Sequence, residues 1–222
     1  MTLLGIGGAM RSGKDAVADY LVSEYGFVKF QMSEPLCDAL LALNPLIDAP
    51  PAHRVTLSDG SWTYLSYPTR LSKLHALLDG DWTELKRIPE VRSLLQRLGT
   101  DVGRDMISPD VWVEAMRRRI LEQYRGDIAA NYDTLIVVTG IRFENELELI
   151  THLGGRGLFL SRRPEKPEAH SHKSESSLYA SDFDFHIRNN GTIPELHEAV
   201  DRFIGEHMPL IARTSNFERK QP

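Results

Sequence analysis

The sequence predicts an α/β fold in which a central parallel sheet of about five strands is flanked by helices. Short apolar runs without a polar face recur along the chain, as expected of strands buried inside a parallel sheet. Longer stretches with apolar residues at helical spacing alternate with these runs. The first run also leads directly through a glycine-rich turn into a helical pattern, which is how a βαβ unit begins.

The opening of the chain is predicted as strand, turn and helix. Residues 3–6 are apolar on both faces, and residues 14–25 place apolar side chains at helical spacing. A second short strand is expected at 27–30, followed by a helix at 36–43 with Pro35 in the first turn. The strand carrying residues 3–6 therefore delivers the glycine-rich turn to the carboxyl edge of the sheet.

The middle third is predicted as an inserted hairpin followed by helices. Residues 55–57 and 62–64 favour strands and flank a Ser-Asp-Gly-Ser turn. Three further stretches are expected to be helical, and in the last of these stretches apolar residues repeat every three to four positions. The helices are expected at residues 70–78, 82–87 and 89–105.

The last part of the chain returns to alternating helices and strands. Ser108, Pro109 and Asp110 combine a hydroxyl cap, a first-turn proline and an early carboxylate, which predicts a helix at 111–124. The elements that follow are expected at residues 134–138, 144–153, 158–160, 185–187 and 193–208. Ligands of such sheets bind beyond the carboxyl ends of the strands, so functional loops are expected there.

One domain is expected over residues 1–212, because the chain of 222 residues leaves little room for two full cores. The hairpin and helices at about 44–105 form an insertion in this domain. A polar loop at about 161–181 has the composition and position of a lid, and residues 213–222 form a frayed tail.

Composition excludes several classes of protein. Twenty-six Lys and Arg against 31 Asp and Glu leave a net charge of −5, which argues against a surface that tracks a nucleic-acid backbone. Cys37 is the only cysteine, so an intrachain disulfide and a cysteine-rich zinc module are excluded. The chain lacks a leader pattern and any run of ~20 apolar residues, so we expect a cytoplasmic protein without a membrane partner.

Residues 8–14 match the P-loop pattern G-x-x-x-x-G-K between a buried strand and a helix, and Asp15 follows. Backbone N–H groups of such a loop surround phosphate oxygens, and the lysine supplies a mobile positive charge. The alternative is a glycine-rich turn with an incidental lysine. We predict that ATP is bound by Gly8, Ala9, Met10, Arg11, Ser12, Gly13, Lys14 and Asp15.

Two residues of this loop carry further predictions. Asp15 replaces the usual Ser or Thr, and its carboxylate is predicted to hold Mg²⁺ directly or through water. Arg11 is predicted to be catalytic with Lys14, because an extra guanidinium neutralises charge on a moving phosphoryl group. A solvated loop arginine is the alternative for Arg11.

Six short motifs, spread over nearly the whole chain, resemble those of deoxynucleoside monophosphate kinases of the bacteriophage type. Their order and context make the set more specific than any one motif. They are Arg-Ser-Gly-Lys-Asp at 11–15, Leu-Gln-x-Leu-Gly-Thr-x-x-x-Arg at 95–104, Asp-x-Trp at 110–112, Arg-Phe-x-Asn-Glu at 142–146, His-x-Ser-Glu at 172–175 and Asn-x-Gly-Thr at 189–192.

The resemblance implies a P-loop kinase fold of the nucleoside monophosphate kinase type. It also implies that the chain phosphorylates deoxynucleoside monophosphates with ATP and Mg²⁺, giving diphosphates that supply DNA precursors. Its partners would then be these small nucleotides without nucleic acid, in the host cytoplasm if a phage encodes the chain. A homodimer is left open.

With this resemblance in view, several residues are predicted to bind the acceptor. Gln96, Thr100 and Arg104 are spaced by four residues and would share one face of a helix, where they could contact a base and a phosphate. The alternatives are a solvated face for these three, core packing for Trp112 and a capped helix start for Ser33. The predicted acceptor residues are Ser33, Pro35, Gln96, Gly99, Thr100, Arg104, Trp112 and Arg142.

The loops after later strands carry the remaining predictions. Arg162 and Arg163 open the expected lid and are predicted to neutralise the transferring phosphoryl group, unless they are basic loop residues without a partner. Asn189 and Gly191 follow the last strand and are predicted to contact the adenine of ATP, the alternative being a plain turn.

Two other functions remain open at this stage. A dephosphocoenzyme A kinase or another small-metabolite kinase would share the P-loop. A non-catalytic ATP-binding assembly protein would fit the absence of an acidic residue at 138–141, after the strand expected at 134–138.

Overall fold

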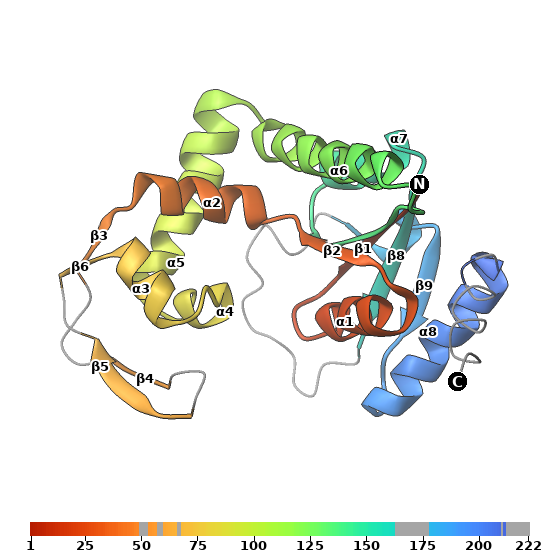
Figure 1. Ribbon diagram of the computed structural model, residues 1–222, viewed down its shortest axis with the longest axis horizontal. Coiled ribbons are helices and arrows are strands. Elements are labelled where there is room, and N and C mark those ends of the chain that lie inside the picture. Colours follow the sequence, from red (N-terminus) through yellow and green to blue (C-terminus); the bar gives the residue numbers. More distant parts are fainter. Residues whose placement is uncertain (49–52, 57–59, 66–67, 163–177, 210, 212–222) are drawn as a thin grey trace. The chain divides into compact units, whose positions relative to one another are not determined.

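The computed structural model describes residues 1–48, 53–56, 60–65, 68–162, 178–209 and 211 (Figure 1). The chain divides into two compact units. The first is formed by residues 1–32 and 116–222, and the second by residues 33–115. The segment expected as an insertion, about 44–105, lies within the second unit, which begins earlier and ends later. The single-domain boundary at 1–212 stays a prediction.

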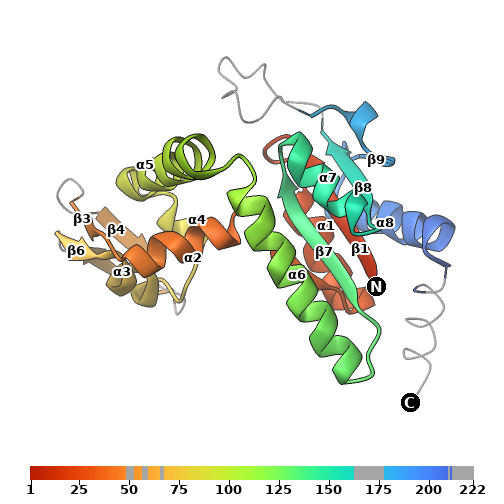
Figure 2. The same cartoon turned by 90° about the horizontal axis from the view of Figure 1, so that it is seen from above.

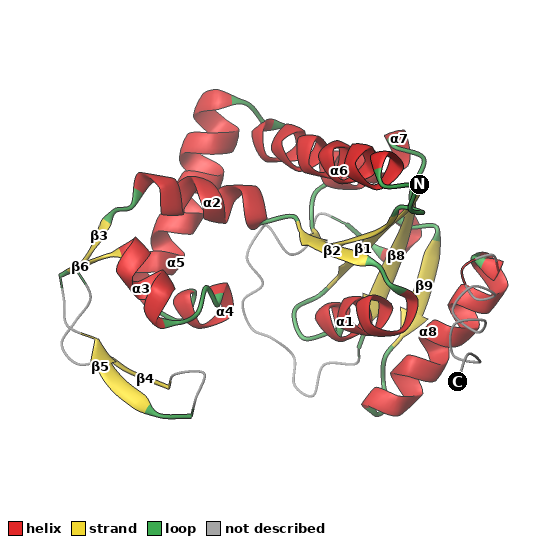
Figure 3. Ribbon diagram, in the orientation of Figure 1, coloured by secondary structure: helices red, strands yellow, loops and turns green. Residues whose placement is uncertain are grey.

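The first unit contains the predicted parallel sheet, and its strand order is β2-β7-β1-β8-β9. All four neighbouring pairs are parallel. The sheet therefore confirms the α/β fold with five parallel strands (Figure 3). Its strands are β1 (Thr2–Gly8), β2 (Val28–Gln31), β7 (Leu135–Ile141), β8 (Arg156–Ser161) and β9 (Phe185–Arg188).

Helices cover both faces of this sheet. Leu4 and Ile6 of β1 form a core with apolar residues of α1 (Lys14–Tyr25) and α8 (Ile193–His207). Gly5 points to the opposite face, where a Cβ atom would lie 2.8 Å from Ile150 of α7 (Glu144–His152). The alternation along β1 thus places α7 on the face opposite α1 and α8 (Figure 2). This explains why both faces of β1 are apolar.

The second unit has its own core. The predicted hairpin is present as β4 (His53–Thr56) and β5 (Trp62–Leu65), and a second antiparallel pair joins β3 (Leu46–Ile47) to β6 (Thr69–Arg70). The unit also contains α2 (Glu34–Leu43), α3 (Leu71–Leu77), α4 (Trp82–Leu85) and α5 (Pro89–Gln96). The buried residues of these helices and of β3 include Cys37, Leu40, Ile47, Leu71, Leu74, Leu85, Val91 and Leu95.

The helix expected at 89–105 changes type halfway. After α5 it continues as a π-helix, η1 (Arg97–Ile107), before α6 (Val111–Ala129) begins. Two buried glycines allow close packing here: a Cβ at Gly99 would lie 2.9 Å from Leu36, and one at Gly103 2.6 Å from Trp112. Hydrogen bonds of a π-helix close at i→i+5, so the apolar stripe predicted for an α-helix is not maintained. Val102 is accordingly exposed.

Two predicted segments fall largely or wholly outside the described residues. Of the expected lid at about 161–181, residues 163–177 are not described, and Ala180–Asp182 form a short 3₁₀ turn. The predicted tail at 213–222 also lies outside the described part. Among the helices that are described, none has the length and apolar character needed to cross a membrane.

Candidate active site

The backbone between β1 and α1 has the shape expected of a P-loop. Gly8 has a φ of 135° and Gly13 a φ of 100°, conformations that side chains other than glycine rarely adopt. A Cβ atom at Gly8 would also overlap the carbonyl oxygen of Leu160 in β8. Arg11 itself lies in the left-handed region, with a φ of 60°. The loop therefore needs both glycines to turn between the strand and the helix.

Lys14 lies over this loop. Its ammonium group donates hydrogen bonds to the carbonyl oxygens of Gly8, at 2.8 Å, and Ala9, at 2.6 Å. The ammonium group therefore already lies at the loop that would hold the phosphates. To bond phosphate oxygens in place of these carbonyl oxygens, only the Lys14 side chain has to move. This position agrees with the predicted role of Lys14, which stays a prediction.

Asn189, which follows β9, contacts the P-loop at Ser12. Both residues are buried, and the side-chain amide of Asn189 donates to the carbonyl oxygen of Ser12 at 2.9 Å. A Cβ atom at Gly13 would lie only 2.5 Å from this amide nitrogen. The Ser12 hydroxyl is buried without a hydrogen-bond partner among the described residues, so the loop contains a polar group that a phosphate oxygen could satisfy.

Asn189 and Gly191 were predicted to contact adenine, and the structure gives both a local structural reason. Asn189 supports the P-loop, and a side chain at Gly191 would have to displace the Glu195 carboxylate. That carboxylate accepts bonds from the backbone N–H of Thr192, at 2.7 Å, and from its hydroxyl, at 2.9 Å. Both hydrogen bonds lower the pKa of the Glu195 carboxyl group, and the bond from the backbone N–H has the larger effect. The adenine contact stays a prediction.

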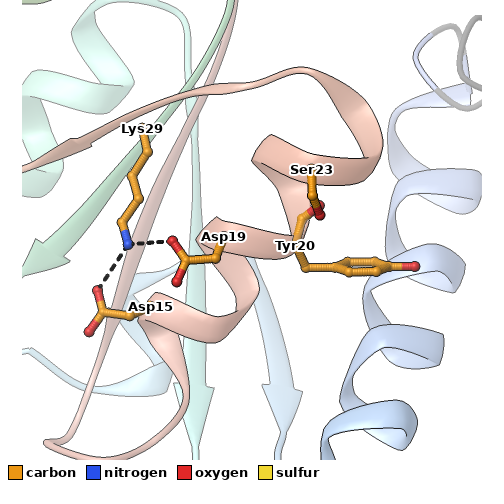
Figure 4. Close-up of polar contacts among 5 residues, drawn as sticks. All are labelled: Asp15, Asp19, Tyr20, Ser23 and Lys29. Carbon is orange, nitrogen blue, oxygen red and sulfur yellow. Dashed lines mark hydrogen bonds and ion pairs between the residues drawn. The ribbon is translucent and has the colours of Figure 1, made fainter. Parts of the chain in front are cut away.

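Asp15, the predicted Mg²⁺ ligand, lies in the first turn of α1 beside Lys29 of β2 (Figure 4). The Lys29 ammonium group is 3.6 Å from the Asp15 carboxylate and 2.8 Å from that of Asp19. Both carboxylates are about 70% exposed, whereas Lys29 is 21% exposed. The ammonium group of Lys29 in β2 therefore pairs with two carboxylates of α1, an interaction that was not predicted from the sequence.

The predicted Mg²⁺ site would need oxygen ligands from the substrate phosphates as well as from Asp15. No group of three or more His, Cys, Asp or Glu side chains in the described part of the chain could hold a metal ion. Mg²⁺ in phosphoryl-transfer sites commonly takes one or two carboxylates and completes its coordination with phosphate oxygens and water. Asp15 is a carboxylate of this kind, next to Lys14 in the loop.

We expect Asp15→Ala to raise the Mg²⁺ concentration for half-maximal rate several-fold, because an anionic oxygen ligand is lost from the phosphate loop. Initial rates at fixed ATP and varied Mg²⁺ measure this. Asp19→Ala is the matched control, since Asp19 is equally exposed and also pairs with Lys29. Equal Mg²⁺ curves for the wild type and Asp15→Ala would place the metal site elsewhere.

Arg142 immediately follows β7, as predicted, at the carboxyl edge of the sheet. Its side chain is exposed, and its backbone N–H donates to the buried carboxylate of Glu146 at 2.8 Å. Glu146 also accepts from the N–H of Phe143 at 3.2 Å and so fixes the turn into α7. The turn therefore presents the Arg142 side chain from a well-defined backbone.

The other predicted arginines lie in the same unit as far as they are described. Arg11 is exposed in the P-loop, and Arg162 is exposed directly after β8, the strand paired with β1. Arg163 lies outside the described residues. Arg11 and Arg162 are thus positioned on the loops after neighbouring strands, where charge could act on a bound phosphate.

The predicted acceptor residues other than Arg142 all lie in the second unit. Gln96 and Thr100 are exposed, and Arg104 is half-buried with a guanidinium nitrogen that donates to the carbonyl oxygen of Pro109 at 3.2 Å. Pro35 is buried in the first turn of α2. The roles of these residues stay predictions, and Arg104 would contact a ligand from a position fixed by the turn before α6.

Gly99 and Trp112 have a packing role. The indole N–H of Trp112 donates to the carbonyl oxygen of Gly99 at 2.9 Å, and the ring packs against Gly103. The glycine that the sequence analysis explained by a close ligand approach is also explained by contact with Leu36. Core packing, the alternative considered for Trp112, therefore accounts for much of its position.

Sequence reasoning missed Lys86, which follows α4. Its ammonium group donates to the Ser33 hydroxyl at 3.3 Å. The local sequence around Lys86 predicts a short helix, and no local pattern indicates that this helix end meets the start of α2. Only the fold of the second unit brings the two residues together.

Comparison with known proteins supplies the remaining findings. The family model for deoxynucleotide monophosphate kinase matches residues 81–200. A protein of Acanthamoeba polyphaga mimivirus is 29% identical over 204 residues, covering 90% of this chain and 94% of the viral protein. The deoxynucleotide monophosphate kinases of Escherichia phage RB69 and Enterobacteria phage T4 are each 24% identical, over 92% and 90% of this chain and 100% and 97% of their own lengths.

Proposed function

Because the chain belongs to the deoxynucleotide monophosphate kinase family, we propose that it transfers the γ-phosphoryl group of ATP to a deoxynucleoside monophosphate, releasing ADP and the diphosphate. The observation that carries this proposal is the P-loop geometry around Lys14, in a chain of this family. The family match at 81–200 does not include the P-loop at 8–14. The two findings are therefore independent, and both support a nucleotide kinase.

In this proposal the P-loop holds the β- and γ-phosphates of ATP. The loop N–H groups and the start of α1 face the phosphates, and Lys14 leaves the carbonyl oxygens of Gly8 and Ala9 to bond phosphate oxygens. Asp15 would hold Mg²⁺, which when bound neutralises charge on the same phosphate oxygens. The hydrogen bond from Asn189 to the carbonyl oxygen of Ser12 stabilises the conformation of the loop.

The acceptor phosphate needs no general base. Its second pKa is about 6, so near neutral pH it is largely a dianion and already nucleophilic. An acceptor oxygen forms a bond to the γ-phosphorus in line as the bond to the ADP oxygen breaks. The negative charge that shifts to ADP is stabilised by Lys14 and by the predicted catalytic arginines, which are Arg11, Arg162 and Arg163.

A panel of acceptors tests this proposal. The wild-type protein is assayed with ATP and Mg²⁺ against deoxynucleoside monophosphates, ribonucleoside monophosphates and dephosphocoenzyme A, with Lys14→Ala purified in parallel to detect contaminating kinases. We expect turnover with one or more deoxynucleoside monophosphates. Turnover only with dephosphocoenzyme A would indicate a metabolite kinase, and ATP binding without turnover would indicate a non-catalytic protein.

The viral origin of the named relatives supports a role in the host cytoplasm, where the enzyme would supply precursors for DNA synthesis. In that role the substrates are free nucleotides. The net charge of −5 agrees with this, because binding to a nucleic-acid backbone favours a basic surface.

For the acceptor side of the reaction, we expect Arg104→Ala to raise the KM for dGMP and dTMP about ten- to a hundredfold, the loss of one charge-assisted bond. The KM for ATP should stay within about twofold, because Arg104 is predicted to contact the acceptor and not ATP. Arg97→Ala, at an exposed arginine that begins the same π-helix, is the control. An unchanged acceptor KM in folded Arg104→Ala would place the acceptor site away from this segment.

A further inference from the structure

Lys86 and Ser33 form a polar pair inside the second unit. Lys86 follows α4, and its ammonium group donates to the hydroxyl of Ser33, immediately before α2, at 3.3 Å. Both residues are half-buried. The Ser33 side chain makes no capping hydrogen bond to α2. The hydroxyl is instead engaged by the lysine.

The charge of Lys86 has no counter-ion in the described part of the chain. No carboxylate described there lies within ion-pair distance of its ammonium group, whose hydrogen bond goes to the neutral Ser33 hydroxyl. Glu84, two residues earlier, pairs with Arg87 at 2.8 Å. A half-buried ammonium group without a counter-ion is costly, and a bound anion would remove that cost.

Lys86 is also held in position through its backbone. Its N–H donates to the carbonyl oxygen of Trp82 at 3.0 Å, and its own carbonyl oxygen accepts from the Arg92 guanidinium group of α5 at 3.1 Å. The side chain therefore begins at a point fixed by both α4 and α5. A cation that is fixed before binding loses less conformational entropy when an anion arrives.

We propose that Lys86 and Ser33 bind the phosphate of the acceptor nucleoside monophosphate. This inference rests on the proposed function and names the side chains that hold the phosphate of its substrate. An ammonium group has three donors, so Lys86 can keep its bond to Ser33 and still donate to phosphate oxygens. The hydroxyl of Ser33 accepts from Lys86 and donates its own proton to the phosphate. The positive potential at the start of α2 adds to this charge but would not define a site alone.

The test uses the full-length protein and two readouts. Isothermal titration measures the Kd for dGMP and for dTMP without ATP, and steady-state kinetics measure the KM for the same acceptors and for ATP. The variants are Lys86→Met, Lys86→Arg and Ser33→Ala. Lys73→Met is the matched control, because Lys73 is an exposed lysine of α3 in the same unit. Circular dichroism confirms that each variant is folded.

We expect Lys86→Met to raise the Kd and KM of the acceptor about tenfold or more, the usual effect of losing a charged hydrogen bond. Lys86→Arg should recover part of this loss, Ser33→Ala should lose less, and Lys73→Met should match the wild type. The KM for ATP should not change. An acceptor Kd in Lys86→Met equal to that of the wild type, or an equal rise in the KM for ATP, would overturn the inference.

The proposed function and this inference fail in different ways. A wild-type protein that phosphorylates no deoxynucleoside monophosphate contradicts the proposed function. A wild-type protein that does so, with acceptor constants unaffected by Lys86→Met and Ser33→Ala, contradicts the phosphate site alone. Ser33→Ala removes only one hydroxyl group and should fold. If Lys86→Met does not fold, the acceptor Kd of Ser33→Ala therefore still tests the phosphate site.

Discussion

We expect turnover to fall about a hundred- to a thousandfold when Lys14 is replaced by alanine, and the protein to remain folded. The ammonium group is the mobile positive charge of the P-loop and would stabilise the charge that develops on the transferring phosphoryl group. Its present partners include the carbonyl oxygens of Gly8 and Ala9, outside the apolar core. The substitution therefore removes charge from the loop without leaving a cavity in the core. Single-turnover rates with saturating ATP and dGMP measure the effect on chemistry.

Two variants make this result specific. Lys14→Arg keeps the positive charge, but its planar guanidinium group does not reproduce a compact ammonium group, so activity should recover only in part. Lys73→Ala removes an exposed lysine from the second unit and should leave turnover unchanged. If Lys14→Ala turned over within about threefold of the wild type, the phosphates would have to be bound elsewhere in the chain.

Most of the fold follows from local sequence patterns. β1 and β7 are predictable because a strand buried on both faces has to be apolar along its whole length. α8 is predictable from its periodic apolar residues and from Thr192, which caps it. The π-helical segment η1 is different, because no local pattern in the sequence predicts it. The close packing of Gly99 against Leu36 of α2 is likewise a contact that no window around Gly99 reveals.

The same distinction applies to the site. The P-loop is a local motif, so the sequence predicts its strand, its glycines and Lys14 together. Its support by Asn189 joins residues 177 positions apart, and the pair of Lys86 and Ser33 joins residues 53 positions apart. These contacts depend on how strands and helices pack and not on spacing along the chain. Polar side chains that meet only through the fold are therefore the ones that sequence reasoning overlooked.

The shape of the P-loop is expected to depend most strongly on Gly8, and Gly8→Ala should cost both stability and ATP binding. An alanine at a φ of 135° is strained by about 1–3 kcal/mol. Its Cβ atom would also overlap the carbonyl oxygen of Leu160, a backbone atom that cannot rotate away. Either β1 and β8 separate or the loop moves, and the carbonyl oxygen that Lys14 bonds moves with it.

Two other glycines separate these causes. Gly26 has a φ of 72°, but a Cβ atom there would meet nothing within 4 Å, so Gly26→Ala measures backbone strain alone, about 1–2 kcal/mol. Gly126 lies exposed within α6 with the same open space, and Gly126→Ala should stabilise the protein by about 1 kcal/mol.

Urea unfolding should therefore rank Gly126→Ala as the most stable variant, then Gly26→Ala, and Gly8→Ala as the least stable. Only Gly8→Ala should also raise the KM for ATP, by about tenfold or more, because only this position shapes the phosphate loop. If Gly8→Ala and Gly26→Ala were equally stable and bound ATP equally well, the close approach of β8 to the loop would have no part in shaping the site.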